Sequence, residues 1–378
     1  MGSNQKQLKA PFPYFGGKSR VAALVWSRLG DVRNYVEPFA GSLAMLLNRP
    51  HEPQIETVND INSFIANFWR AMKFDPQAVA RFADDPVNEC DLHSRHAWLV
   101  RSRKARAELA RVRRDPHYFN AKIAGWWCWG ARMWIGSGWC DERQQIPHMD
   151  GRYQPSSSAV VAAELHQKRP NLPDGSDGSR GVISSQIPEL AGEAGRPQLA
   201  DQYSRGRGIH GNDALTNCEL RRRWLIDWFQ RLRDRLRPVR VCCGHWNRVC
   251  DSESTLTRLG TTGVFLDPPY RKRLACGKQN RAPHIYGNDK SQDVDKLVDE
   301  VQAWCLKWGD NRDIRIAVCG LEGEYPELDA AGWDKVAWKS VGGYGNRNKN
   351  NDNAERERIW FSRYCLAGTE HKQAELFA

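Results

Sequence analysis

Short runs of apolar and β-branched residues stand out along the chain, and each ends in polar, glycine or proline residues. Runs of this kind are typical of strands that are buried on both faces of a parallel sheet. The expected strands cover residues 34–39, 54–60, 239–243, 263–267 and 314–319. Two later runs, 335–339 and 358–362, predict a closing antiparallel hairpin with a long loop over 342–353. The pattern therefore predicts an α/β fold.

Apolar residues at helical spacing predict helices between these strands, over 21–29, 63–72 and 219–236. The apolar face of the last helix consists of Trp224, Leu225, Trp228, Phe229, Leu232 and Leu236. Its arginines lie mostly off that face: Arg221, Arg222, Arg223, Arg231, Arg233 and Arg235. A core helix with a solvated basic back is the favoured interpretation, ahead of a helix that faces phosphates.

A long insertion interrupts the strand pattern, because two strands precede residue 61 and the others follow residue 238. Its first part, roughly 85–145, is basic and helical in pattern; its second part, about 146–215, is rich in Gly, Pro, Ser and Asp. The second part is typical of loop or disordered chain. We expect one domain in two pieces, 1–84 and 221–378, separated by an insertion over 85–220.

The charge balance of the 378-residue chain narrows the class of partner. A net charge of +11 favours a polyanion, and nucleic acid is the first candidate because basic side chains release counterions from phosphates. No stretch is apolar enough for a spanning helix, and the amino terminus lacks a signal-peptide pattern, so a cytoplasmic protein is expected. Cys242, Cys243, His245 and Cys250 lie close together, but their spacing does not suit a zinc site, and no metal is expected.

The most specific chemical signal is the sequence Asp267-Pro268-Pro269-Tyr270, directly after a buried run. Open α/β sheets bind ligands at the carboxyl ends of their strands, where this turn would lie. An exocyclic amine on a base is a poor nucleophile, and acceptors on both of its hydrogens favour the charge that develops on nitrogen. The Asp267 carboxylate and the Pro268 carbonyl can serve as those acceptors, and Tyr270 can stack on a base.

A second signal closes the first predicted strand, where Glu37-Pro38-Phe39-Ala40-Gly41-Ser42 ends in a glycine turn before a helix. Such a turn lets the backbone approach a ligand closely. Asp60 ends the second strand, where a carboxylate can hold the two hydroxyls of a ribose. The chain lacks a GxGxxG turn at this place, so an adenosine cofactor without a pyrophosphate fits better than NAD.

Four motifs in order carry a resemblance to a known family: PYFGGK at 13–18, VEPFAGS at 36–42, VNDIN at 58–62 and FLDPPY at 265–270. Together they resemble the Dam-type adenine-N6 DNA methyltransferases, the D12 class or alpha group. The resemblance covers about 1–75 and 238–365, and the insertion lies where that family keeps its DNA-recognition region. It implies a seven-stranded S-adenosylmethionine-dependent methyltransferase sheet with helices on both faces and the last strand inserted antiparallel.

The resemblance also implies roles for residues at matching positions. The catalytic residues would be Asp267, Pro268, Pro269 and Tyr270. The S-adenosylmethionine site would consist of Tyr14, Gly17, Lys18, Glu37, Pro38, Phe39, Ala40, Gly41, Ser42, Asp60, Ile61 and Asp267. This chain departs from the family at Leu43, where a further glycine is usual, and at His245-Trp246, where an acidic-aromatic pair is usual. Trp246 either lines the adenine pocket or packs structurally.

Most DNA-binding residues are expected in the insertion, and one more, Arg347, in the loop over 342–353. Tryptophans interleaved with glycines over 125–139 either stack on bases or pack the insertion, and these two alternatives stay open. The basic run that ends at Arg114 is either a solvated face or a phosphate contact. The expected DNA contacts are Arg111, Arg113, Arg114, Trp127, Arg132, Trp134, Trp139 and Arg347.

The sequence therefore predicts N6-adenine methylation of double-stranded DNA by direct transfer to a flipped-out base. A cytosine-N4 or RNA amino methyltransferase would use the same DPPY chemistry, and a catalytically silent DNA-binding relative would keep the fold. The intact motifs argue against the silent relative. A monomer, encoded by a bacterium or a phage, is expected.

Overall fold

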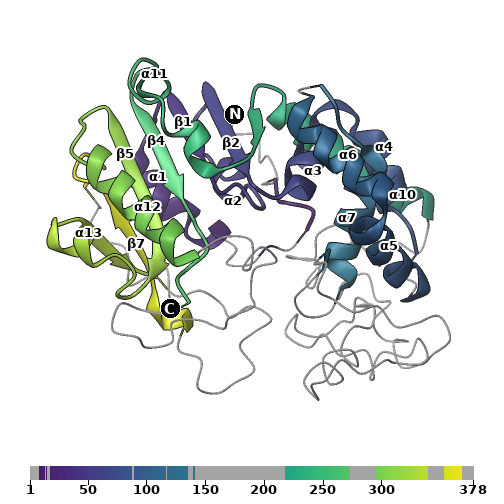
Figure 1. The fold of residues 1–378 in the computed structure, drawn as a ribbon. Helices are drawn as coiled ribbons and strands as arrows, with labels where there is room; N and C mark the ends of the chain where they lie inside the picture. Colours follow the sequence, from purple (N-terminus) through teal and green to yellow (C-terminus); the bar gives the residue numbers. More distant parts are fainter. Residues whose placement is uncertain are drawn as a thin grey trace, which may run out of the picture.

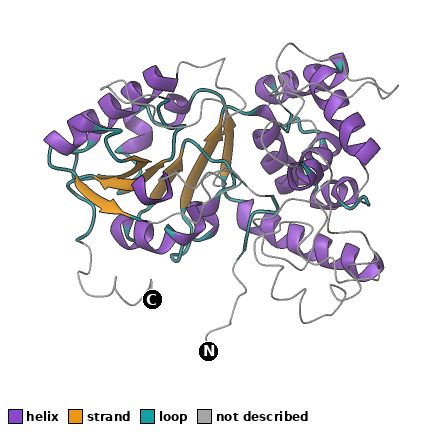
Figure 2. Cartoon of the chain, turned by 90° about the horizontal axis from the view of Figure 1, so that it is seen from below, coloured by secondary structure: helices purple, strands orange, loops and turns teal. Residues whose placement is uncertain are grey.

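The protein consists of two regions that lie side by side (Figure 1). The sheet region contains the strands and the helices that cover them, and the helical region contains α3 to α7 together with α10. The same division is visible from below, where the strands gather on one side only (Figure 2). The computed structural model describes residues 8–12, 14, 18–86, 89–115, 117–134, 139–140, 218–272, 294–338 and 353–367.

The sheet confirms the α/β fold and each predicted strand. Its seven strands follow the order β3-β2-β1-β4-β5-β7-β6. β7 is antiparallel to β5 and β6, and the other pairs are parallel. The antiparallel insertion of the last strand is therefore also confirmed. The strands are β1 (Asn34–Glu37), β2 (Ile55–Asp60), β3 (Arg240–Cys243), β4 (Thr262–Leu266), β5 (Ile314–Leu321), β6 (Asp334–Ala337) and β7 (Glu357–Phe361).

Alternate residues of the strands point into two separate cores. Tyr35 and Phe265 pack on one face, whereas Val36, Val264 and Leu266 pack on the other. This alternation follows from the two-residue period of a strand, and burial of both faces explains the nearly continuous apolar runs. The short and long helices of this region are η1 (Lys18–Arg20), α1 (Ala22–Leu29), α2 (Ala44–Leu47), η5 (Trp246–Val249), α11 (Glu253–Leu256), α12 (Val294–Trp308), α13 (Pro326–Ala330) and α14 (Asn353–Arg356).

The helical region is built around α7, which packs on α3, α4 and α5. α10 packs on α3 and α4, so segments from both sides of the insertion meet in one bundle. Sequence patterns predicted α3 and α10 but not α4. The helices are α3 (Ser63–Phe74), α4 (Pro76–Ala83), α5 (Glu89–Arg101), α6 (Arg103–Arg114), α7 (Ala121–Met133) and α10 (Cys218–Leu236). Among the described residues, no helix combines the length and apolarity that crossing a bilayer requires.

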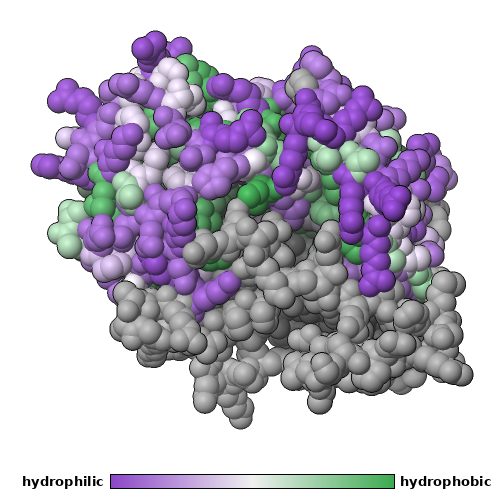
Figure 3. Space-filling model, viewed as in Figure 1, coloured by the Kyte–Doolittle hydropathy of each residue, from purple (hydrophilic) through white to green (hydrophobic). Residues whose placement is uncertain are grey.

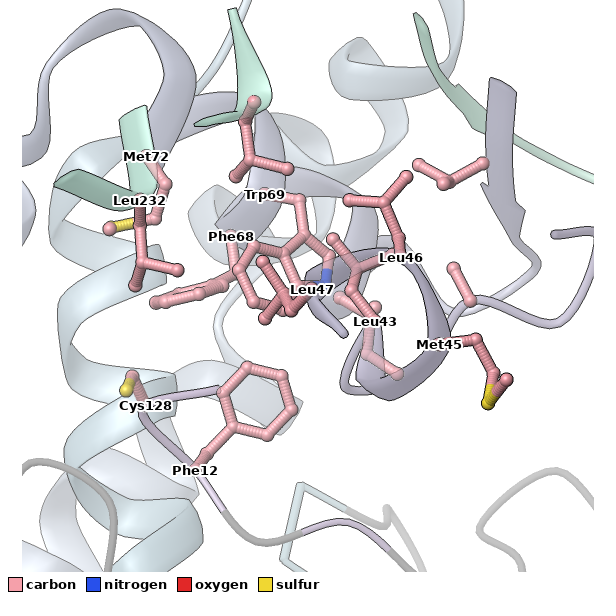
Figure 4. Packing of buried hydrophobic residues seen from close by; sticks show 14 of the residues in the cluster. Phe12, Leu43, Met45, Leu46, Leu47, Phe68, Trp69, Met72, Cys128 and Leu232 are labelled. Atoms are coloured by element: carbon pink, nitrogen blue, oxygen red, sulfur yellow. The ribbon is translucent and has the colours of Figure 1, made fainter. Parts of the chain in front are cut away.

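Apolar packing joins the two regions, as Figure 4 shows. Phe12 lies against Phe68 and Trp69 of α3, with ring centroids 5.2 and 5.5 Å away. Ion pairs add to this contact, because Arg235 of α10 reaches the buried Glu56 of β2 at 2.6 Å. The arginines of α10 are thus not all solvated: Arg222, Arg223 and Arg233 are exposed, but Arg235 ties the regions together.

Candidate active site

The carboxyl ends of β1, β2 and β4 meet at one edge of the sheet. β1 lies between the other two and pairs in parallel with both. The turn after β1 begins at Pro38, the turn after β2 begins at Ile61, and the DPPY segment follows β4. Parallel pairing therefore brings the three motif segments to a single place, as expected for a ligand site on such a sheet.

The two carboxylate oxygens of Asp267 differ in their contacts with the described residues. The Nζ atom of Lys18 lies 3.0 Å from Oδ1, and the hydroxyl of Tyr270 lies 3.4 Å from the same atom. Within the described residues, no contact ends on Oδ2 or on the carbonyl oxygen of Pro268. The Asp267 side chain is 22% exposed. Two hydrogen-bond acceptors therefore remain open at the sheet edge.

A buried network supports this carboxylate. Lys18, which is 4% exposed, donates a hydrogen bond of 3.0 Å to the Tyr270 hydroxyl. Tyr270 in turn donates to Glu357 of β7 over 2.8 Å. The Nζ atom of Lys18 also lies 5.5 Å from the centre of the Trp338 ring. The sequence patterns suggested no role for Glu357 or Trp338, because only the folded chain brings them to the DPPY turn.

Burial and the neighbouring charges shift the pKa values of the groups in this network. Burial raises the pKa of Asp267, and Lys18 opposes that rise. Burial also raises the pKa of Glu357. Although burial opposes a charge on Lys18, the neighbouring carboxylates of Asp267 and Glu357 raise the pKa of its ammonium group. Lys18 is thus held in its charged form between two carboxyl groups.

Glu37 at the end of β1 is a second buried acid. Its Oε2 atom accepts hydrogen bonds from the Tyr35 hydroxyl at 3.0 Å and from the Leu46 backbone N–H at 3.3 Å. Burial, which the two hydrogen bonds only partly offset, raises its pKa to about 8. The carboxyl group therefore fixes the start of α2 against β1.

Asp60 fastens two loops together. Its Oδ2 atom accepts from the Gly41 N–H at 3.0 Å, and Oδ1 accepts from the Asn62 N–H at 2.8 Å. Burial raises its pKa to about 6 against these two bonds. Trp69 of α3 supports the same turn, because its indole N–H donates to the Gly41 carbonyl at 2.9 Å. Carboxylate oxygens have further lone pairs, so both loop contacts leave room for a ligand hydroxyl.

The turn after β1 requires unusual backbone angles. Gly41 has φ +45°, and a Cβ atom there would lie 2.4 Å from a ring carbon of Tyr14. Tyr14, itself 37% exposed, thus covers the turn closely, as glycine alone permits. Leu43 has φ 55° and ψ 31°, which is left-handed for a buried non-glycine residue. A leucine in this conformation costs roughly 1 kcal/mol relative to the ordinary backbone regions.

Aromatic residues line the end of β3 beside this turn. Trp246 stacks on Phe39 with ring centroids 6.0 Å apart and an interplanar angle of 23°. Trp246 is 4% exposed, and its buried indole N–H has no hydrogen-bond partner among the described residues. The amide of Asn59 links the adjoining turns, because it donates to the carbonyls of Pro38 and Gly244. An unpaired buried donor beside a half-buried ring suits a planar ligand with acceptor atoms.

The arginines predicted to contact DNA have different surroundings. Arg113 donates to the Ser63 hydroxyl at 2.8 Å and to the Ile61 carbonyl at 3.0 Å, so it braces the loop beside Asp60. Arg111 pairs with Asp115 at 3.1 Å and lies 4.1 Å from the centre of the Tyr118 ring. Arg114 is exposed at the end of α6. Hydrophilic side chains cover much of the helical region on the face that Figure 3 shows.

The predicted tryptophan contacts require a correction. Trp127 and Trp134 are each 6% exposed, and Trp127 packs 4.7 Å from the ring of Phe12. Trp139 is half-buried, and its indole N–H donates to the Trp127 carbonyl at 2.9 Å. A Cβ atom on Gly130 would lie 1.9 Å from the Trp139 ring, so the interleaved glycines make room for rings. The packing alternative therefore accounts for Trp127 and Trp134.

The remaining predicted residues are Arg132, Gly17 and Arg347, together with the cysteines near the end of β3. Arg132 of α7 is half-buried. Gly17 and Arg347 lie outside the described residues. In the described part of the chain, no group of three or more His, Cys, Asp and Glu side chains could hold a metal ion. Cys243 and Cys250 are buried free thiols, and Cys242 is half-buried.

The seven-stranded sheet with its antiparallel β7 is consistent with an α/β methyltransferase fold. The family model described as "D12 class N6 adenine-specific DNA methyltransferase" matches residues 14–111. The match confirms the resemblance to this family over residues 14–111. It includes the turns after β1 and β2 but ends before the DPPY segment. A search of the curated proteins found no match.

Proposed function

We propose that the protein transfers a methyl group from S-adenosylmethionine to the N6 amine of an adenine that is flipped out of double-stranded DNA. The observation that carries this proposal is that, among the described residues, neither the Oδ2 atom of Asp267 nor the carbonyl of Pro268 accepts a hydrogen bond. Two neighbouring acceptors match the two hydrogens of an exocyclic amine. The family match supports DNA adenine as the substrate.

The residues at the sheet edge fit S-adenosylmethionine. Asp60 would accept hydrogen bonds from the ribose hydroxyls of the cofactor. The adenine ring of the cofactor would lie against the ring of Phe39 and accept a hydrogen bond from the indole N–H of Trp246. Tyr14 and the Gly41 turn would border the methionine end. The cofactor supplies an electrophilic methyl group on a sulfonium. The negative charge of the Asp267 carboxylate favours that positive charge.

Asp267 and Pro268 would act on the target amine by orientation and charge. Acceptors on both hydrogens turn the nitrogen lone pair toward the methyl group, and they stabilise the positive charge that develops on nitrogen. Lys18 keeps the Asp267 carboxylate charged and fixes it through Oδ1, which leaves Oδ2 for the amine. The Tyr270 ring is 7% exposed and its hydroxyl points into the network, so stacking of Tyr270 on the base stays a prediction.

The helical region is the proposed DNA-binding part. α6 ends in Arg111, Arg113 and Arg114, and exposed arginines on α10 add to the positive charge. Phosphate contacts of this kind position the duplex without reading its sequence. Arg114 is the best candidate, because Arg111 and Arg113 already have partners within the protein.

Purified protein incubated with labelled S-adenosylmethionine and unmethylated duplex DNA provides the test. Digestion to nucleosides and mass spectrometry should show N6-methyladenine. N4-methylcytosine would be consistent with amine methylation but would contradict adenine as the target base. In a parallel incubation with RNA, label on RNA and none on DNA would contradict DNA as the substrate. Cofactor binding without any methylated product would identify a silent relative.

A further inference from the structure

Glu357 is the first residue of β7, which lies between β5 and β6, and it pairs with Leu321 of β5. It is 7% exposed, and its Oε2 atom accepts the Tyr270 hydroxyl over 2.8 Å. A buried carboxylate is costly unless it is paired and hydrogen-bonded. Glu357 is therefore placed where it must contribute to the network around Asp267 or destabilise the fold.

The Tyr270 hydroxyl has a single hydrogen and must choose its acceptor. It receives a hydrogen bond from Lys18 at 3.0 Å and can donate to Glu357 at 2.8 Å or to Asp267 at 3.4 Å. The shorter distance favours Glu357. Because Glu357 takes this hydrogen, the hydroxyl keeps a lone pair toward Lys18 and does not weaken Asp267 as an acceptor.

We propose that Glu357 is a positioning residue for methyl transfer, which acts through the Tyr270 hydroxyl and Lys18 to present Asp267 to the target amine. This inference rests on the proposed function of the site. Without the charge of Glu357, the Tyr270 hydrogen turns to Oδ1 of Asp267, and the ammonium group of Lys18 pairs with Asp267 alone. Both changes draw electron density away from the carboxylate and weaken its bond to the amine.

A pH profile reports this effect, because several titratable groups face Asp267 from neighbouring elements. They are Lys18 of η1, Glu37 of β1, Tyr270 of the DPPY turn, the Cys319 thiol of β5 and Glu357 of β7. Burial raises the pKa of Cys319, so that thiol stays neutral. Removal of the negative charge at Glu357 lowers the pKa of Asp267, and the acid limb of the rate profile should move to lower pH.

The test measures single-turnover methyl transfer to DNA by the full-length protein from pH 5 to 9. Glu357→Gln keeps the shape but removes the charge, so the Tyr270 hydroxyl has a weaker acceptor there. The rate should fall about 10- to 100-fold with unchanged cofactor and DNA affinity. Glu357→Asp restores the charge and should restore the wild-type acid limb. Glu322→Gln is the control, since Glu322 follows β5 and forms ion pairs with Lys335 and Arg358 of the closing hairpin but contacts neither Tyr270 nor Asp267 among the described residues.

A double-mutant cycle distinguishes positioning from general loss of structure. In a Tyr270→Phe background the path through the hydroxyl is already cut and only the charge effect on Lys18 remains, so Glu357→Gln should reduce the rate less than it does in the wild-type background. A Glu357→Gln rate within twofold of a wild-type protein that forms N6-methyladenine would overturn the positioning role and leave the proposed function standing. Equal losses in both backgrounds, or an unmoved acid limb, would also overturn it. A wild-type protein that forms no N6-methyladenine would overturn both proposals.

Discussion

The two regions use their charged side chains in opposite ways. In the sheet region, acids are buried around a single edge: Glu37, Asp60 and Glu357 are 2%, 8% and 7% exposed. In the helical region, Arg70 is buried to hold backbone carbonyls, and Arg113 braces a neighbouring loop. Burial of a charge without complete pairing marks a functional site, whereas complete pairing marks a structural one. Position in a basic run therefore says little about DNA contact until the partners of each arginine are known.

Substitution of Asp267, in the sheet region, should cause the largest loss of activity. Asp267→Ala removes one of the two acceptors for the target amine, and turnover should fall about 10²- to 10³-fold while cofactor and DNA still bind. Steady-state methylation assays measure the loss of turnover, and equilibrium binding assays with cofactor and with DNA show whether binding is kept. Turnover close to that of the wild-type protein would remove the proposed mechanism.

Arg70 provides the corresponding test in the helical region. Its Nη1 atom lies 2.8, 2.9 and 2.9 Å from the carbonyls of Val112, Asp115 and Tyr118. Arg70→Met leaves these groups unpaired, and the free energy of unfolding should fall by about 2–4 kcal/mol. Denaturant unfolding checks this value, with the exposed Arg114→Met as control. An equal effect of both substitutions would contradict the distinction between paired and exposed arginines.

Asp60 tests whether the sheet edge holds the cofactor ribose. Asp60→Asn should raise the KM for S-adenosylmethionine about tenfold, because a weaker acceptor replaces a charged one. In the wild-type protein this affinity should weaken as pH falls through about 6, where the raised pKa of Asp60 leads to its protonation. The variant should lack that dependence. A KM that is unchanged at every pH would exclude the ribose contact.

The smallest effect concerns DNA binding by α6. Arg114→Gln should reduce the slope of log affinity against log salt by about one, as expected for the loss of one phosphate contact. Arg113→Gln should affect the KM for S-adenosylmethionine more than the salt slope, because Arg113 contacts the loop beside Asp60. Identical salt slopes for the wild-type protein and Arg114→Gln would assign α6 to the solvated surface.

The strand pattern and the motif turns could be predicted from the sequence, since both are local. Buried parallel strands leave continuous apolar runs, and Asp267 and Gly41 lie in short segments with a recognisable order of residues. α12 and α4 were not predicted from the sequence, although the structure contains both.

Other site residues depend on contacts that sequence spacing does not reveal. Glu357 meets Tyr270 across the last strand, and Trp69 reaches Gly41 from α3. The tryptophans of α7 were ambiguous for a related reason. A ring beside glycine is compatible with a stacking surface and with close packing, and only the position of Trp139 against Gly130 decides between them.

Nucleoside analysis of DNA methylated by the wild-type protein and by Asp267→Asn tests the central claim most directly. Asn keeps the shape of the side chain but removes the charge that Lys18 holds in place. We expect N6-methyladenine with the wild-type protein and a loss of at least about 10²-fold in the variant at equal cofactor binding. N6-methyladenine formed at similar rates by both proteins would contradict the claim that the Asp267 carboxylate activates the target amine.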